Sequence, residues 1–373
     1  MNVVIVGAGT FGASLAWWLA RSGHEVTLVD QFEPGDPRAT SGGESRLIRC
    51  SHGSDAGYTQ TARRAGELWR ELERESGQTL MEECGVVWFA HRDDGWEAES
   101  EATLGGLGIP TQRLEPDEAA RLFPSVGIAD VTFALLEPEA GVVRAQRAVR
   151  ALAAQAEAHG ARLVRGRARP EGGATVLGDG GHVEGDAVVW ACGGWLGRLF
   201  PELVRLTVTC QELLFFDCGP EWHYTRVPGW VDYDLAMYGT GDLDGLGFKA
   251  ALDVEGPRLD PDAELPPAGA TEERVRAYLT ERFPALGTAP LREGRCCRYE
   301  LSPDSHFIAA PHPEQRGVWL LGGGSGHGFK HGPAIAELVA ATLEGGAALP
   351  ERFALRERVP GRSLRTAGSG VRS

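Results

Sequence analysis

The chain has 373 residues, a mass of 40.0 kDa and a formal net charge of −15 at pH 7. Its 42% hydrophobic and 24% charged residues are typical of a folded protein with a sizeable core, and a prior of about 150 residues per domain predicts two or three domains. The negative charge disfavours nucleic acid and membrane surfaces as partners, and no apolar run approaches the roughly 20 residues that a membrane span requires.

The first residues of the chain bear on its cellular compartment. Met1 leads directly into an apolar run at residues 3–6, so no signal peptide is expected. The 7 cysteines are odd in number and irregular in spacing, which predicts free thiols rather than a disulfide framework. We therefore expect a reduced, cytoplasmic protein.

Residues 3–30 predict a nucleotide-binding βαβ unit. Residues 3–6 and 25–29 read as buried strands, and residues 13–21 read as an amphipathic helix between them. The first strand runs into the turn Gly7-Ala8-Gly9-Thr10-Phe11-Gly12, and the second ends at Asp30, 18 residues after Gly12. A GxGxxG turn alone is weak evidence, but a strand, a helix and an acid in this order favour a dinucleotide site over a glycine turn without a ligand.

Strands and helices alternate through the rest of the chain. The predicted helices cover about residues 57–75, 96–108, 116–122, 144–159 and a stretch ending near 344, and the predicted strands cover 85–90, 161–164, 187–191, several segments of 206–253, and 318–321. Because nucleotide-fold signals occur at the start, the middle and the end, we predict an α/β fold with a discontinuous Rossmann-like domain.

We assign residues 1–80, 142–210 and 300–373 to this domain. Residues 81–141 and 211–299 are predicted to form a second, α+β domain with a mostly antiparallel sheet, and a pocket between the two domains is the expected site. The Gly-, Ser- and Arg-rich tail after about residue 361 is expected to be disordered.

Lysine is rare in this chain and occurs in matched contexts. Of the 37 basic residues only two are lysines, Lys249 and Lys330, and each follows a Gly-Phe pair. Arginine does not reproduce a compact ammonium whose pKa shifts readily on burial. A functional role for both lysines is therefore favoured over chance survival.

Three segments, together with the glycine turn, resemble the monomeric sarcosine oxidase family of flavin-dependent amine oxidases. The segment at residues 294–304, with Cys297-Arg298-Tyr299 followed by Pro303-Asp304, resembles the family's flavin-attachment segment. Residues 324–330 resemble its Gly-His-Gly-Phe-Lys turn, and residues 45–49 its Thr-Arg-Ile-Ile-Arg segment. The resemblance extends from Val3 to about Glu344. It implies FAD rather than NAD, a choice that Asp30 alone leaves open because an acid suits the ribose in either.

The resemblance also implies a covalent thioether between FAD and Cys297. Cys297 is favoured over Cys296 because it alone keeps the Cys-x-Tyr register, although a buried free cysteine in the core is the ordinary alternative. The other residues expected to contact FAD are Gly7, Gly9, Thr10, Phe11, Gly12, Asp30, Gln31, Ser45, Arg46, Gly324, Gly326, Gly328, Phe329 and Lys330.

By the same resemblance, Arg49 and Lys330 hold the substrate carboxylate, and Lys249 activates oxygen. These assignments agree with the chemistry, because a guanidinium and an ammonium both make charge-assisted hydrogen bonds, and a buried cation stabilises negative charge developing on oxygen. The resemblance further implies that Tyr238 and Tyr299 line the substrate pocket, with packing tyrosines as the alternative. His327 sits at a glycine-rich helix start, whose backbone N–H groups are expected to face an electron-rich edge of the flavin.

A metal site is not expected. His327 and His331 have the i, i+4 spacing of a metal pair. A zinc site needs a third ligand from elsewhere, and no HExxH or CxxC motif accompanies the pair.

The chain departs from the family pattern at three places. Gly42 and Asp253 stand where the family usually has histidines, and Cys210-Gln211 stands where an Arg-Gln pair is expected. We interpret these changes as changes in the pocket. Asp253 then suits a substrate with a positive or hydrogen-bond-donating side group, bulkier than sarcosine.

The expected function is FAD-dependent oxidation of a secondary or cyclic amino acid to an imine, with oxygen reduced to hydrogen peroxide. The expected partners are a small amino or imino acid and oxygen, and the protein is expected to be a monomer. A desaturase or dehydrogenase with another electron acceptor is one alternative. A flavin-carrying subunit without turnover of its own is the other.

Overall fold

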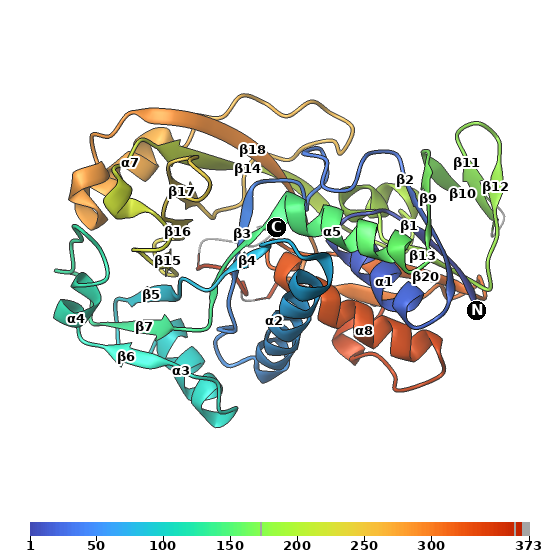
Figure 1. Cartoon of the computed structure of the whole chain (residues 1–373), viewed down its shortest axis with the longest axis horizontal. Helices are drawn as coiled ribbons and strands as arrows, with labels where there is room; N and C mark the ends of the chain where they lie inside the picture. Colours follow the sequence, from blue (N-terminus) through green and yellow to red (C-terminus); the bar gives the residue numbers. More distant parts are fainter. Residues whose placement is uncertain (172–173, 362, 368–373) are drawn as a thin grey trace.

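The computed structural model describes residues 1–171, 174–361 and 363–367, and two large sheets organise it (Figure 1). The first sheet has the strand order β19-β20-β13-β1-β2-β9. Its strands are β19 (Ile308–Pro311), β20 (Val318–Gly322), β13 (Ala187–Trp190), β1 (Asn2–Val6), β2 (Glu25–Asp30) and β9 (Arg162–Arg165). All neighbours are parallel except β19 and β20. This is the sheet of a Rossmann-like domain.

Covering helices explain why every residue of β1 after Asn2 is apolar. Helix α1 (Thr10–Arg21) packs against α5 (Ala145–Ala158) and α8 (Gly332–Leu343), and α2 (Ala56–Ser76) packs against α8. In Figure 1 these four helices lie together beside the first sheet. A parallel sheet is covered on both faces, so its central strands need no polar alternation. Val3, Val4 and Ile5 are accordingly fully buried.

The second large sheet has the strand order β18-β14-β17-β16-β15-β5-β7-β6. Its strands are β18 (Leu291–Leu301), β14 (Thr207–Phe216), β17 (Phe248–Leu252), β16 (Met237–Thr240), β15 (Gly229–Asp232), β5 (Val86–Ala90), β7 (Phe133–Glu137) and β6 (Gln112–Leu114). All its pairings are antiparallel except that of β15 with β5. Helices α3 (Trp96–Gly106), α4 (Pro116–Ala120) and α7 (Glu272–Arg282) belong to the same end of the molecule (Figure 1).

Two small sheets and several short helices complete the described residues. One sheet joins β3 (Ser45–Ile48), β8 (Gly141–Arg144) and β4 (Met81–Glu82), and the other joins β10 (Ala168–Glu171), β11 (Ala174–Leu177) and β12 (His182–Val183). The short helices are α6 (Leu196–Leu199), η1 (Gly193–Trp195), η2 (Pro220–Trp222), η3 (Pro284–Leu286), η4 (Phe329–His331) and η5 (Glu351–Phe353).

The predicted α/β fold, with a mostly antiparallel second sheet, is confirmed. The division into two domains stays a prediction, which the membership of the two large sheets supports. The first helix begins at Thr10 rather than at residue 13, because Gly9 is already its N-cap. Helix α7 and strand β3 were not predicted, because apolar residues do not recur in either segment at the regular spacing of a helix or a strand.

The C-terminal tail differs from the prediction of disorder. Residues 363–366 are buried, and Leu364 joins the main hydrophobic core. A polar composition does not exclude order when a few residues insert into a cavity and find hydrogen-bond partners there. Residues 362 and 368–373 of the predicted tail lie outside the described residues.

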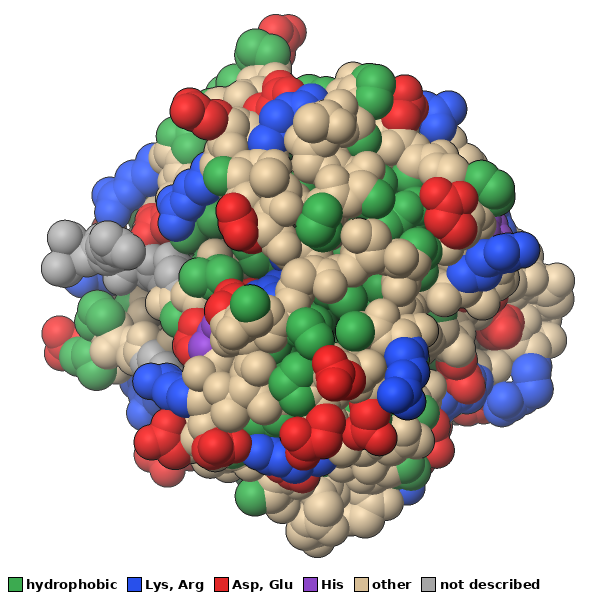
Figure 2. Space-filling model, turned by 90° about the vertical axis from the view of Figure 1, so that its left-hand side faces the viewer, with side chains coloured by type: hydrophobic (Ala, Val, Ile, Leu, Met, Phe, Trp, Pro, Cys, Tyr) green, Lys and Arg blue, Asp and Glu red, His purple; other side chains and the backbone are tan. Residues whose placement is uncertain are grey.

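Charged side chains of both signs cover the face of the molecule drawn in Figure 2. Figure 2 shows the end of the molecule formed by the second sheet, where acidic and basic side chains are interspersed rather than gathered by sign. Among the helices of the described residues, none combines the length and apolar character that crossing a membrane requires.

Candidate active site

The glycine turn is built from glycines with three different tasks. Gly7 has a φ of +108°, and a Cβ there would lie 2.3 Å from the Ala191 carbonyl oxygen. A Cβ on Gly12 would lie 1.8 Å from the Gly7 carbonyl oxygen, so Gly12 permits close packing of α1 on the turn. A Cβ on Gly9 would have Ser41 Oγ as its nearest neighbour, at 3.2 Å. Gly7 and Gly12 therefore serve the fold, whereas Gly9 keeps the backbone open toward a ligand.

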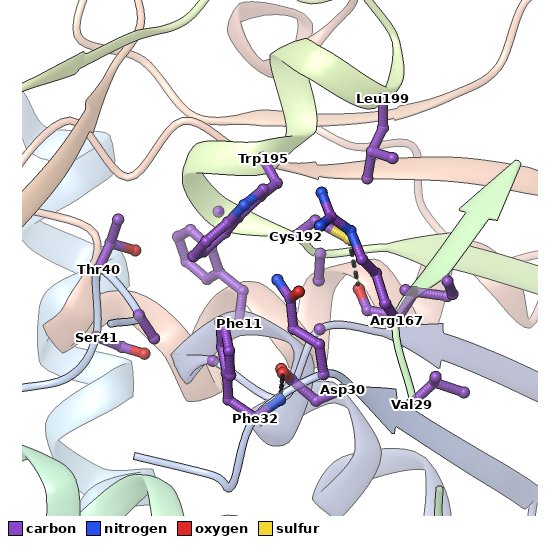
Figure 3. Close-up of a pocket in the computed structure, with 18 of the residues that line it drawn as sticks. Phe11, Val29, Asp30, Phe32, Thr40, Ser41, Arg167, Cys192, Trp195 and Leu199 are labelled. Carbon is purple, nitrogen blue, oxygen red and sulfur yellow. Dashed lines mark hydrogen bonds between the residues drawn. The ribbon is translucent and has the colours of Figure 1, made fainter. Parts of the chain in front are cut away.

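A first cavity of about 880 Å³ opens beside this turn (Figure 3). Asp30 borders it, and its carboxylate accepts hydrogen bonds from the backbone N–H groups of Ala8 (2.6 Å) and Phe32 (2.7 Å). Burial raises the pKa of Asp30. Of the residues predicted to contact the cofactor, Gly7, Gly9, Thr10, Phe11, Asp30 and Gln31 line this cavity.

The first cavity also has walls that the sequence did not reveal. In Figure 3, Thr40 and Ser41 lie on one side of the cavity and Arg167 on the other, with Trp195 above Asp30. Two of these walls come from the polar loop before β3 and from the Cys-Gly-Gly turn after β13. Without the strand order, however, nothing showed that both meet the glycine turn.

Three cavities form a continuous path through the molecule. A second cavity, of about 380 Å³, shares Thr10, Phe11, Thr40, Ser41 and Glu300 with the first. A third cavity, of about 540 Å³, shares Arg46, Tyr299, Gly326 and Phe329 with the second. The path therefore runs from the glycine turn to the residues predicted to bind substrate. An extended dinucleotide fits this shape.

The third cavity gathers most of the predicted catalytic residues from separate elements. Arg49 follows β3, Lys330 lies in η4, and Asp253 follows β17. The other predicted residues on its walls are Tyr238 from β16, Tyr299 from β18, and His327 from the turn before η4.

Two buried cations dominate the third cavity. Arg49 donates hydrogen bonds to the carbonyl oxygens of Ser51 and, at 3.3 Å, Leu364, and burial lowers its pKa to about 10. Lys330 Nζ donates to the carbonyl oxygen of His327 at 3.1 Å. Burial, and then the charge of Arg49, hold the pKa of Lys330 well below its usual range. Within the described residues, both cations donate their hydrogen bonds to backbone carbonyls, so both charges remain available to an anion.

Lys249 lies next to the path rather than on its walls. Its side chain is buried, and Nζ donates to the carbonyl oxygen and Oγ of Ser45 at 3.3 and 3.2 Å. Burial, and then the neighbouring charge of Arg46, lower the pKa of Lys249 to about 7. Arg46 itself borders the second and third cavities, and its guanidinium donates to the carbonyl oxygens of Ser45, Thr40 and Gly42.

The two adjacent cysteines of β18 face different surroundings. Cys297 packs in one buried cluster with Tyr299, two positions along the same face of the strand, and lies near Lys249. Cys296 instead contacts Cys210 and lies near Glu212. The strand alternation thus directs Cys297, and not Cys296, toward Lys249.

The tyrosines lie together in the dry part of the site. The hydroxyl oxygens of Tyr238 and Tyr299 are 3.4 Å apart, and burial raises the pKa of both. Lys249 Nζ is 5.8 Å from the ring centroid of Tyr238.

The turn before η4 follows an unusual backbone path. Ser325 has a φ of +48° and Gly326 a φ of +73°, and a Cβ on Gly328 would lie 2.6 Å from Gly324 Cα. Gly324, Gly326, Gly328 and Phe329 line the second cavity, as predicted for cofactor contacts.

A third histidine joins the predicted pair, which the sequence did not show. His52 Nε2 lies 3.2 Å from His331 Nε2, and His52, His327 and His331 are close enough together to hold one metal ion. The third ligand that a metal site would need from elsewhere in the chain is therefore available in His52. However, burial, and then the charges of Lys330 and Arg49, lower the pKa of all three imidazoles, and the same charges oppose a metal cation. Absence of a metal stays a prediction.

Of the three departures from the family pattern, only Asp253 lies in the third cavity. A Cβ on Gly42 would lie 2.1 Å from the Asp36 carbonyl oxygen, so the loop requires glycine there. Gln211 donates to the carbonyl oxygen of Val254, outside the cavity walls. The interpretation of Gly42 and Cys210-Gln211 as changes in the pocket is therefore wrong.

Comparison with known proteins identifies the family. Residues 2–342 match the family model described as DAO, FAD dependent oxidoreductase, and the chain belongs to that family. It is 29% identical to the monomeric sarcosine oxidase of Bacillus sp. (strain B-0618), over 91% of each chain. It is 25% identical to the N-methyl-L-tryptophan oxidase of Yersinia pestis (strain Pestoides F), over 91% of this chain and 94% of that protein. The resemblance to the sarcosine oxidase family, the dependence on FAD and the prediction of an amine oxidase are confirmed at the level of the family.

Solved structures share the fold. L-proline dehydrogenase from P. horikoshii matches with a TM-score of 0.82 and 22% identity, over 94% of this chain and 96% of that one. The open form of NikD, described as an unusual amino acid oxidase essential for nikkomycin biosynthesis, matches with a TM-score of 0.77 and 22% identity, over 95% and 97% of the two chains.

Proposed function

We propose that this protein oxidises the C–N bond of a secondary or cyclic amino acid, bulkier than sarcosine, to an imine and passes the electrons to oxygen, forming hydrogen peroxide. The observation that carries the proposal is the meeting of Arg49 and Lys330 in a buried cavity that is continuous with the nucleotide path. Sarcosine oxidase and N-methyl-L-tryptophan oxidase, which the chain resembles over most of its length, support this class of substrate.

The path has the features that FAD requires. Gly9 leaves the N-terminus of α1 open to a phosphate, and Asp30 offers a carboxylate to a ribose. We assign the middle of the path, lined by Arg46 and the turn at residues 324–329, to the flavin, and propose Cys297 as the attachment point. When bound, FAD supplies the two-electron acceptor for the amino acid.

Arg49 and Lys330 orient the amino acid. A carboxylate placed between them gains charge-assisted hydrogen bonds and restores the charge balance of two buried cations. The carboxylate is then fixed at one end of the cavity, so the C–H bond beside the amine faces the flavin portion of the path. Orientation in a dry site accounts for the rate without a separate strong base.

Lys249 supports the reaction with oxygen. Its pKa of about 7 leaves part of the population as an ammonium at neutral pH, and its enclosure excludes water. A cation at that position stabilises negative charge that develops on oxygen. Tyr238 and Tyr299 exclude water from the cavity, and their raised pKa values keep them as neutral hydroxyls.

One observation favours a second candidate, a dehydrogenase or desaturase with another electron acceptor. Lys249 does not border the three cavities, and its Nζ is engaged by Ser45. Restricted access of oxygen to this amine is the feature that such an enzyme would have. The third alternative, a flavin-carrying subunit without turnover, is disfavoured because such a protein has no need of two buried cations, Arg49 and Lys330, on the wall of a cavity.

The experiment is anaerobic bleaching of the flavin absorbance by a panel of N-methyl, cyclic and bulky amino acids, followed by admission of air. Bleaching that reverses in air with release of peroxide is the expected result. Bleaching that persists in air identifies the dehydrogenase. If no amino acid bleaches the flavin, the proposed function is wrong. We also propose a cytoplasmic monomer, which sedimentation of the purified holoenzyme checks for its oligomeric state.

A further inference from the structure

The C-terminal segment (residues 363–367) supplies one wall of the third cavity. It is tied to surrounding elements at several points. The hydroxyl group of Tyr233 donates to the carbonyl oxygen of Ser363 at 3.0 Å, and the Ala367 N–H donates to the carbonyl oxygen of Tyr233 at 2.9 Å. Thr366 Oγ1 donates to the carbonyl oxygen of Asp253 at 2.8 Å. Arg365 and Thr366 line the cavity together with the residues assigned to substrate.

Arg365 is held in one position by three contacts. Its Nη1 donates to Asp253 Oδ1 at 2.5 Å, and its guanidinium carbon lies 5.0 Å from the ring centroid of Tyr299. On a third side it lies against the turn before η4, where a Cβ on Gly326 would be 2.4 Å from Arg365 Cδ. Arg365 and Asp253 are both buried. A planar guanidinium fixed in this way presents its remaining N–H groups in a defined direction.

The ion pair of Arg365 and Asp253 has no net charge, but its polar atoms can still form hydrogen bonds at this wall of the third cavity. The charges of Arg365 and Asp253 cancel, so a second charged group brought here by a substrate would be buried without compensation. An apolar group would leave buried polar atoms without partners, which also costs free energy. Within the described residues, the hydrogen bond of the Arg365 guanidinium runs from Nη1 to Asp253, so its other N–H groups are the ones that can meet a substrate. A neutral group that both donates and accepts hydrogen bonds meets these conditions best.

We propose that Arg365 and Asp253 determine substrate specificity, and that they select amino acids whose side group is uncharged and both donates and accepts hydrogen bonds, such as a carboxamide. This inference rests on the proposed function and narrows its substrate class. It replaces the expectation of a positively charged side group, because Arg365 already neutralises Asp253.

The test compares four N-methyl amino acids of similar length that differ only in side-group chemistry. They are N-methyl derivatives of glutamine (neutral and polar), glutamate (anionic), lysine (cationic) and leucine (apolar), each offered as both enantiomers to the holoenzyme. The rate constant of anaerobic flavin bleaching at low substrate concentration reports kcat/KM for flavin reduction. The glutamine derivative should react at least about tenfold faster than each of the others, because a site built for hydrogen bonds rejects an analogue that lacks them.

A double variant separates specificity from folding. Replacing both charges at once, as Asp253→Leu with Arg365→Met, avoids a buried unpaired charge, and such apolar replacements are often tolerated. This variant should keep the flavin absorbance spectrum and reverse the preference toward the leucine derivative. Arg64→Met serves as the control, since Arg64 forms exposed ion pairs with Glu67 and Glu337 away from the cavities. The control should keep the preference for glutamine.

The outcomes separate this proposal from the proposed function. Preference of the unmodified enzyme for the charged or apolar derivatives overturns the specificity proposal and leaves amine oxidation intact. A glutamine preference that survives in the double variant also overturns it. Failure of every amino acid, including the cyclic and bulky ones, to bleach the flavin contradicts both.

Discussion

The first and third cavities lie at the two ends of one path, with the second cavity between them. Different interactions determine the structure of each. The first is determined by the backbone, because Gly7 and Gly12 leave no room for a side chain and Asp30 accepts from two N–H groups of its own βαβ unit. The third is determined by charge, because the cations Arg49, just after β3, and Lys330, in η4, meet in a buried space. A site made by local backbone is readable in a short motif. A site made by charge depends on which distant segments the fold brings together.

The largest expected effect tests the backbone side of this comparison. Gly12→Ala places a Cβ 1.8 Å from the Gly7 carbonyl oxygen, so α1 must move away from the turn. We expect a loss of more than about 3 kcal/mol in the free energy of unfolding and loss of bound FAD. Flavin absorbance of the purified protein and thermal unfolding measure both. Gly105→Ala, where a Cβ would meet nothing within 4 Å, is the matched control and should keep the flavin. A stable Gly12→Ala variant that retains FAD would break the comparison.

Next in size is the effect of removing a charge from the third cavity. Arg49→Met or Lys330→Met removes one of the two cations proposed to hold the carboxylate. We expect kcat/KM for flavin reduction to fall about 100- to 1,000-fold, the size that loss of one buried charged hydrogen bond produces. Flavin absorbance should stay unchanged, because neither side chain lines the first or the second cavity. A fall of less than threefold for both variants would remove the carboxylate role.

Lys249→Met separates the two half-reactions. The rate of flavin reduction should stay within about threefold of the original, and the rate of reoxidation by oxygen should fall about 10- to 100-fold. Stopped-flow absorbance measures both steps on one sample. Reoxidation at the original rate would show that this amine has no role with oxygen.

The pH dependence of reoxidation sharpens the same point. Burial lowers the pKa of Lys249 to about 7, so the ammonium predominates below that pH and is lost above it. The reoxidation rate should therefore decrease as the pH rises through about 7. In Lys249→Met this decrease should be absent, and its persistence would assign it to another group.

The smallest expected effect distinguishes two neighbouring thiols. Cys297→Ser should release the flavin on acid precipitation, whereas Cys296→Ser should leave the precipitate yellow, because the two side chains face different surroundings. Both variants should unfold within about 1 kcal/mol of the original protein. Colour lost from Cys296→Ser and kept in Cys297→Ser would reverse the assignment.

The sequence predicted the parts of the molecule that local rules govern. The βαβ unit, the long helices and the residues before η4 carry their signals within a few positions of each other. His52 and Arg365 were missed for a different reason. His52 gains its significance from His331, and Arg365 from Asp253, and no periodicity or short motif connects residues so far apart. The prediction of a disordered tail failed for the same reason. Composition does not show that Leu364 packs into the hydrophobic core or that Arg365 lines the third cavity.

Because lysine is scarce, chemical modification of lysine reports whether the active site of this protein is closed or open. Lys249 and Lys330 are the two lysines of the chain, and their side chains are 2% and 4% exposed. Reagents that acylate amines therefore meet no lysine on the surface of the folded molecule. Acylation of either lysine requires opening of the site, so its rate follows the population of open molecules. Mass spectrometry after a short acylation pulse would thus count opened molecules directly, without an added probe.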